Sequence, residues 1–147
     1  MNVTAADVIS SLFNPTDTVC FRVFDDKKSG TFPGAKLSCE CGKYKTIEET
    51  LKNHNRLDRG VFFVVNYGGQ DDGAITRINA QFVEMDNDSF EDQKKKIDAF
   101  PLPPSMVIRT QKSYHVYWFM DSTSKVERFR TIQTQLVKHF DGDPMCV

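Results

Sequence analysis

Two carboxylates, Glu84 and Asp86, stand two residues apart in the segment FVEMD, at the end of an apolar run. If this run is a strand, the alternation of its side chains puts both acids on one face and Val83 and Met85 on the other. Two carboxylates on rigid backbone suit Mg²⁺ or Mn²⁺, which share their coordination shell between protein oxygens and substrate phosphates. The alternative is that the acids only end the strand and begin a polar turn. E-x-D is a common triplet, so it does not decide between the two.

A second strand is expected at SYHVYWFM, where the same period of two puts Ser113, His115, Tyr117 and Phe119 on one face. A hydroxyl and an imidazole at this spacing can both donate hydrogen bonds to phosphate oxygens, and Lys112 adds a positive charge beside them. The alternative is a structural histidine hydrogen-bonded within an aromatic strand. Taken alone, the segment favours that alternative.

A third acidic site, Asp141 and Asp143 in FDGDP, follows a long amphipathic segment that ends at Phe140. A D-G-D-P string is most often a solvated turn. It gains chemical meaning only if it supplies a further carboxylate to a metal site formed by the first pair of acids.

The elements that must position these residues follow from periodicity and turn signals. Strands are expected at 60–66, 75–86, 106–110 and 113–120, and helices at 90–100 and 125–140. The continuous apolar run Gly60–Asn66 is typical of a central strand buried on both faces. The two-residue connection at 111–112 favours an antiparallel hairpin. The order predicts an α+β fold with a mixed or antiparallel sheet flanked by helices.

The chain has 147 residues, which predicts one domain: residues 1–58 form an N-terminal α/β extension and residues 59–147 a core that bears the motifs. With 19 Lys and Arg against 20 Asp and Glu, the surface is not basic as a whole. Any nucleic-acid contact must therefore come from a local patch.

No membrane span and no secretory signal are visible, so we expect a protein of the cytoplasm or of a host cell's interior. The four cysteines are sparse for a disulfide framework, and we expect free thiols. The pair Cys39 and Cys41 lacks a second pair of ligands, which argues against a zinc module.

In order, the segments VFFVVNYGG, ITRINAQFVEMDN, PPSMVIRTQKSYHVYWFM and FDGDP resemble the archaeo-eukaryotic primase superfamily, in its plasmid and phage RepB-like primase or primase-polymerase branch. The resemblance covers the chain from Gly60 onward. It implies a primase-type catalytic core with an RRM-like sheet. It also implies that Glu84, Asp86 and Asp143 bind catalytic Mg²⁺ or Mn²⁺, with Asp141 as the less favoured match for the third position.

The resemblance further implies that Ser113 and His115 contact the phosphates of the incoming nucleotide, and that His115 counts with the three acids among the catalytic residues. Lys112 and Arg109 are weaker candidates for nucleotide or template contact. The implied function is DNA primase or polymerase activity, a metal-dependent nucleotide addition in plasmid or phage replication. Its partners would be a single-stranded DNA template, nucleoside triphosphates and a helicase domain or other replication protein.

Two features depart from the family's pattern. Glu84 stands where many relatives carry Asp, and relatives usually continue past G-D-P with an Arg-containing segment that is not present here. The second departure predicts either a C-terminally truncated chain or a short form with weak independent activity. Two other functions therefore stay open: a catalytically inactive primase-like module that binds nucleic acid or protein, and a metal-dependent nuclease. The intact acidic motifs favour an enzyme.

Overall fold

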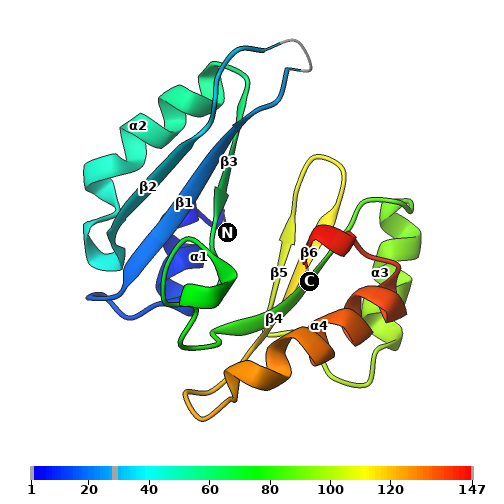
Figure 1. Ribbon diagram of the computed structural model, residues 1–147. Helices are drawn as coiled ribbons and strands as arrows, with labels where there is room; N and C mark the ends of the chain where they lie inside the picture. The colour runs from blue at the N-terminus through cyan, green and yellow to red at the C-terminus, as the bar shows by residue number, and fades with distance from the viewer. Residues whose placement is uncertain (1, 28–29, 147) are drawn as a thin grey trace. The chain divides into compact units, whose positions relative to one another are not determined.

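The computed structural model describes residues 2–27 and 30–146 (Figure 1). Contacts within the chain divide it into two compact units, Met1–Thr76 and Arg77–Val147. Each unit has its own three-stranded antiparallel sheet and two α-helices. The predicted α+β class is confirmed. Among the residues described, no helix is both long and apolar enough to cross a membrane.

The first unit has strand order β2-β1-β3. Helix α1 begins after Thr4, whose hydroxyl accepts a hydrogen bond from the Asp7 amide while the Asp7 carboxylate accepts one from the Thr4 amide. This capping box satisfies donors that the first helical turn leaves without partners. The elements of the unit are α1 (Ala5–Leu12), β1 (Thr18–Asp25), β2 (Ala35–Glu40), α2 (Lys45–Arg56) and β3 (Arg59–Phe63), with short 3₁₀ helices η1 (Cys41–Lys43) and η2 (Asp72–Ala74).

Strand β3 corrects one prediction. The apolar run at Gly60–Asn66 gives a shorter strand that pairs with β1 at the edge of the first sheet, and the Phe62 side chain is 51% exposed. Helix α2 packs against β3, so only one of its faces is covered. An apolar run of this length cannot distinguish a central strand from an edge strand. The strand lies in the first of the two units, and a motif-bearing core that begins at residue 59 stays a prediction. That the chain works as one domain stays a prediction.

The second unit has strand order β4-β6-β5. Its elements are β4 (Ala80–Met85), α3 (Phe90–Ala99), β5 (Met106–Arg109), β6 (Tyr114–Phe119), α4 (Val126–Phe140) and the 3₁₀ helix η3 (Pro144–Cys146). The antiparallel β5-β6 hairpin is as predicted. The strand expected at 75–86 is shorter and begins at Ala80. Before it, the Thr76 amide donates to the Tyr67 carbonyl, and this bond ties the preceding residues into a loop.

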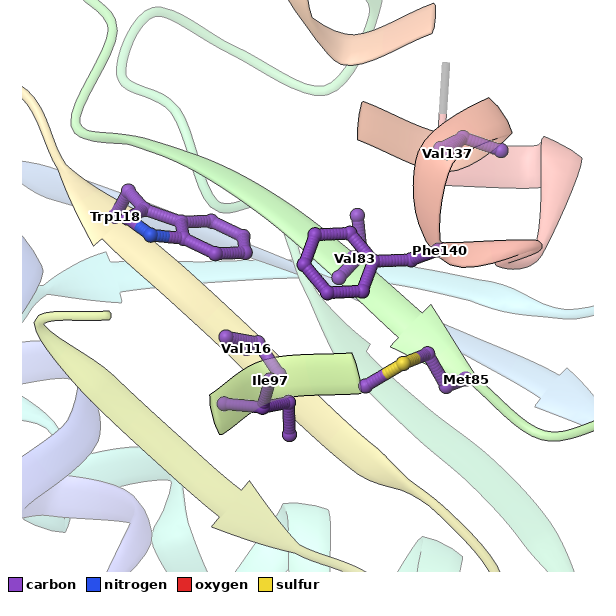
Figure 2. Close-up of a cluster of buried hydrophobic side chains, with 7 residues drawn as sticks. All are labelled: Val83, Met85, Ile97, Val116, Trp118, Val137 and Phe140. Carbon is purple, nitrogen blue, oxygen red and sulfur yellow. The ribbon is translucent and has the colours of Figure 1, made fainter. Parts of the chain in front are cut away.

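Apolar side chains from two of the three strands and from both helices form the core of the second unit (Figure 2). They are Val83 and Met85 of β4, Val116 and Trp118 of β6, Ile97 of α3, and Val137 and Phe140 of α4. Because strand side chains alternate, Glu84 and His115 must point to the opposite face of the sheet. The core thereby fixes the direction in which both motifs point.

The buried side chain of Gln133 joins α4 to the free edge of β4. Its amide oxygen accepts hydrogen bonds from the Phe82 amide (3.2 Å) and from Nε2 of Gln81 (2.8 Å), and its own Nε2 donates to the Phe82 carbonyl (2.5 Å). A glutamine amide can replace a neighbouring strand because it carries both a donor and an acceptor. This contact anchors the helix that leads to Asp143.

Candidate active site

Glu84 and His115 lie directly opposite each other on the neighbouring strands β4 and β6. Nδ1 of His115 is 3.6 Å from Oε1 of Glu84, and the two side chains are 24% and 30% exposed. They lie on the face opposite the hydrophobic core, where a ligand can still reach them. The strand register thus brings two of the sequence motifs into contact, and the pair is an ion pair whenever the imidazole is protonated.

The D-G-D-P segment returns from α4 to β4. Asp141 closes the helix in the left-handed conformation (φ 51°), and the Gly142 amide donates to the Val137 carbonyl (2.9 Å). The Asp143 amide then donates to the Glu84 carbonyl (2.9 Å). A Cβ on residue 142 would lie 3.0 Å from that same carbonyl oxygen. Glycine therefore permits the close approach that places Asp143 beside Glu84.

Three potential metal ligands meet at this point. One carboxylate oxygen of Glu84, one of Asp143 and Sγ of Cys146 all lie within 4.8 Å of one another, and the three residues are half-buried. From the sequence we assigned Cys146 only as a free thiol. Its amide donates to the Asp143 carbonyl (3.1 Å), so the short turn of η3 carries the thiol back to the acids. No spacing rule for metal ligands marks this cysteine in the sequence.

Burial and nearby negative charge oppose the ionisation of Glu84 and of Cys146. Burial raises the pKa of Glu84 above its ordinary value, the negative charges of Asp143 and Asp86 raise it further, and His115 acts in the opposite direction. Burial, with the nearby Glu84 and Asp143, raises the pKa of the Cys146 thiol to about 12. A divalent cation would relieve this accumulated negative charge. Carboxylate oxygens are the donors that Mg²⁺ and Mn²⁺ prefer, so Glu84 and Asp143 fit such an ion.

The other two predicted acids are placed differently. Asp86 is exposed just beyond the end of β4, and its charge is felt by Glu84. Within residues 2–27 and 30–146 it is not one of the three residues whose ligand atoms meet. Asp141 is exposed at the end of α4, also outside that cluster. Of the two aspartates in D-G-D-P, it is Asp143 that faces Glu84.

Ser113 is buried in the turn of the β5-β6 hairpin. Its hydroxyl lies 2.9 Å from Oγ1 of Thr110, and the Thr110 oxygen also accepts a hydrogen bond from the Ser113 amide (3.1 Å). The Ser113 side chain thus shapes the hairpin, and Thr110 is a partner that sequence reasoning missed. Lys112 is exposed at the hairpin's tip.

Arg109 is not brought to the Glu84–His115 face. It pairs with Tyr114, whereas its neighbour Ile108 pairs with His115. Its guanidinium carbon lies 4.3 Å from the centre of the Phe90 ring, on the side of the sheet that α3 covers. Arg109 therefore has a packing role in this structure. Its neighbour Ile108, and not Arg109, is paired with His115, so the Arg109 side chain points to the opposite face of the sheet.

No protein-family model and no curated protein sequence matches the chain. Among solved structures, the archaeo-eukaryotic primase (AEP) domain of the cyanophage S-2L primase-polymerase superposes with a TM-score of 0.76 at 25% identity, over 92% of this chain and 71% of that chain. Primase RepB′ superposes with a TM-score of 0.64 at 17% identity, over 95% of this chain and 45% of that chain.

A third similar structure is the catalytic domain of primase RepB′ in complex with initiator DNA, with a TM-score of 0.64, 16% identity, and coverage of 95% of this chain and 69% of that chain. The two RepB′ structures are similar to this chain in fold. Together with the phage domain they confirm the resemblance that the motifs indicated: the chain has the fold of the archaeo-eukaryotic primases, in the form found in RepB-like primases and phage primase-polymerases.

Proposed function

We propose that this chain is a metal-dependent, template-directed nucleotidyltransferase of the primase-polymerase type. The observation that best supports the proposal is the convergence of Glu84, Asp143 and His115 on one face of one sheet. These residues come from three segments far apart in the sequence. Burial raises the pKa of Glu84, and catalytic sites commonly carry such perturbed groups.

Glu84 and Asp143 would hold Mg²⁺ or Mn²⁺ through their carboxylates, with Asp86 beside them. When bound, such an ion neutralises charge on a triphosphate and lowers the pKa of a hydroxyl. The Glu84 carboxylate must be ionised to act as a ligand, so metal affinity should rise with pH through its raised pKa.

His115 would donate a hydrogen bond from its ring to the phosphate oxygens of the incoming nucleotide. Its Nδ1 lies 3.6 Å from Oε1 of Glu84, which would leave Nε2 as the donor. Ser113 and Thr110 fix the turn that sets the start of β6, and Lys112 adds a positive charge at the hairpin. In the reaction, a primer 3′-hydroxyl loses its proton, its oxygen bonds to the α-phosphorus, and pyrophosphate leaves. The side chains position and stabilise charge throughout.

Single-stranded DNA is the proposed template, and nucleoside triphosphates are the proposed substrates. The complex of the RepB′ catalytic domain with initiator DNA supports the choice of DNA. A helicase or other replication protein is the proposed partner, and the reaction would take place in the cytoplasm or inside a host cell, where replicating DNA is found.

A second candidate, a binding module without catalysis, is favoured by two specific placements. Arg109 packs against Phe90, and the Ser113 hydroxyl is engaged by Thr110. Both groups would be less available to a triphosphate than the family resemblance implies. Such a module would bind nucleic acid on the same sheet face without extending a primer.

An incorporation assay separates the two candidates. The full chain is incubated with single-stranded DNA, with or without a primer, together with labelled nucleoside triphosphates and Mn²⁺ or Mg²⁺. We expect metal-dependent incorporation that falls by roughly 10²-fold or more in Asp143→Asn and in Glu84→Gln, as loss of an electrostatic catalytic group does. Asp141→Asn, which changes an acid outside the cluster, should leave incorporation unchanged.

DNA or nucleotide binding without any incorporation would favour the binding module. Incorporation that survives in Asp143→Asn and in Glu84→Gln would contradict the proposed site.

A further inference from the structure

We infer that Cys146 makes the Glu84–Asp143 pair a capture site for Zn²⁺, and that bound Zn²⁺ excludes the catalytic ion. The inference rests on the proposed function only in sharing these two carboxylates. It concerns a thiol that the proposed reaction does not use.

The donor atoms form a mixed set. Sγ of Cys146 and one oxygen each of Glu84 and Asp143 lie within 4.8 Å of one another, and Nδ1 of His115 is 3.6 Å from Oε1 of Glu84. Sulfur, imidazole nitrogen and carboxylate oxygen are the donors that zinc takes in proteins, most often four in a tetrahedron. The two carboxylates alone would suit Mg²⁺, whereas the set with sulfur suits Zn²⁺.

The separations are close to those that zinc requires. With Zn–S near 2.3 Å and Zn–O near 2.1 Å, two ligand atoms of a tetrahedral site are about 3.6 Å apart. No two ligand atoms of Glu84, Asp143 and Cys146 are more than 4.8 Å apart, so each separation has to close by at most about 1.2 Å. Rotation of the Glu84 side chain can supply such a change, since that side chain is 30% exposed.

The backbone holds the thiol in place. The Cys146 amide bonds to the Asp143 carbonyl, and the Asp143 amide bonds to the Glu84 carbonyl. A chain of two backbone hydrogen bonds thus connects all three ligand residues. By contrast, Cys39 lies on β2 and Cys41 begins η1, both in the first unit. Within the described part of the chain, the only cluster of three potential ligands is the one that includes Cys146.

Zn²⁺ bound here would compete with the catalytic ion, because both ions need the carboxylates of Glu84 and Asp143. The thiol gives up its proton as the Zn–S bond forms, so one proton is released per ion bound. An ion held by Cys146, Glu84 and Asp143 uses both carboxylates of the proposed catalytic metal site. The same carboxylates cannot hold Mn²⁺ at that moment.

Cobalt serves as the spectroscopic probe. Co²⁺ is titrated into the full chain, and a thiolate-to-cobalt charge-transfer band is followed in the near ultraviolet. We expect the band in the wild type and in Cys39→Ser, its loss in Cys146→Ser, its displacement by Zn²⁺ and its persistence in excess Mg²⁺. Zinc affinity should fall by at least about tenfold in Cys146→Ser. Mn²⁺ affinity, measured by loss of the free-ion electron paramagnetic resonance signal, should change by less than about twofold.

A charge-transfer band that persists in Cys146→Ser, or that disappears in Cys39→Ser, would overturn the inference. If Mn²⁺ binds and no cobalt band forms, the zinc inference fails while the proposed function stands. If neither Mn²⁺ nor Co²⁺ binds, both fail.

Discussion

The backbone amide of Asp143 donates a 2.9 Å hydrogen bond to the carbonyl oxygen of Glu84. The bond lies along the edge of β4 that faces away from β6. Two residues earlier on the same edge, the side chain of Gln133 bonds to the backbone amide and carbonyl of Phe82. The last acid is therefore positioned by backbone geometry, and Oδ1 of its carboxylate also accepts a hydrogen bond from the Met145 amide (2.9 Å). It also follows that the site depends on residues that carry no catalytic group.

Gly142 is the first of these. A Cβ at this position would lie 3.0 Å from the Glu84 carbonyl oxygen and 3.8 Å from Cβ of Val83. We expect Gly142→Ala to displace the turn by a few tenths of an ångström and to lower Mn²⁺ affinity by roughly tenfold, because small misplacements of positioned groups are costly. Calorimetric titration with Mn²⁺ measures this. Gly73→Ala is the matched control, since a Cβ there meets nothing within 4 Å. Equal Mn²⁺ affinity in the two variants would show that the close approach does not matter.

Glu84 should lower the stability of the metal-free protein at neutral pH. Its pKa in the folded state is raised, chiefly by burial, so its contribution to stability is complete below its ordinary pKa and is lost as pH rises through the folded value. The glutamine side chain in Glu84→Gln cannot ionise, so this variant keeps the stability of the neutral form at every pH. We expect its melting temperature at pH 7 to exceed that of the wild type by about 2–6 °C, and the difference to vanish in acid.

Glu49→Gln is the control with the opposite sign. A hydrogen bond from Arg56 holds the pKa of Glu49 below its ordinary value, so its contribution is present above the ordinary pKa and is lost as pH falls. This variant should not be stabilised at pH 7. Thermal unfolding of both variants across pH 4–8 tests the signs, and a Glu84→Gln protein less stable than the wild type at pH 7 would refute the desolvation argument.

His115 should affect nucleotide binding more than folding. Its ring faces Glu84 and is not part of the hydrophobic core of the second unit, so truncation leaves the packing of that core in place. We expect His115→Ala to lose most of the thermal shift that a nucleoside triphosphate with Mn²⁺ produces, because a ligand stabilises only the state that binds it. The melting temperature without ligand should stay close to that of the wild type. In His139→Ala, an exposed histidine of α4 whose ring lies against Phe100, the ligand shift should be unchanged. Equal ligand shifts in His115→Ala and wild type would remove His115 from the site.

Gln133 should prove a structural residue. Gln133→Leu leaves the Phe82 amide and carbonyl without their partner and removes one of the two acceptors of Gln81 Nε2, which we expect to cost about 2–4 kcal/mol. Urea unfolding measures the loss. Gln135→Leu, an exposed position on the same helix, should change stability by less than about 0.5 kcal/mol. Similar losses in the two variants would mean that the amide does not complete the edge of β4.

The direction of the functional side chains could be predicted from the sequence, since it follows from a period of two. Val83 and Met85 are buried in the core, and Glu84 and His115 share the other face, as expected. The boundaries of the strands could not be predicted as well. Residues 75–79 resemble the start of a strand because they include the β-branched residues Ile75, Thr76 and Ile78, yet the Thr76 bond to Tyr67 ties them into a loop.

Two features could not be predicted from the sequence alone. One is that Cys146 lies beside the acids, and the other is that Arg109 and His115 lie on opposite faces of the sheet. Cys146 meets the acids only because η3 turns back on itself, which no spacing rule for metal ligands encodes. Arg109 and His115 both lie on hairpin strands, but their relative faces depend on register, and a shift of one residue exchanges the faces. The two aspartates of D-G-D-P differ in the same way, because the left-handed turn at Asp141 sends only Asp143 towards β4.

The most direct test of the central claim, that Glu84, Asp143 and His115 form one site for metal and triphosphate, is paramagnetic relaxation mapped by NMR. Mn²⁺ is titrated into isotopically labelled protein with and without a nucleoside triphosphate, and the broadening of each backbone amide is recorded. We predict broadening centred on the amides of residues 84, 115 and 143, strengthened by nucleotide and abolished in Asp143→Asn but not in Asp141→Asn. Broadening centred elsewhere, or unchanged in Asp143→Asn, would contradict the claim.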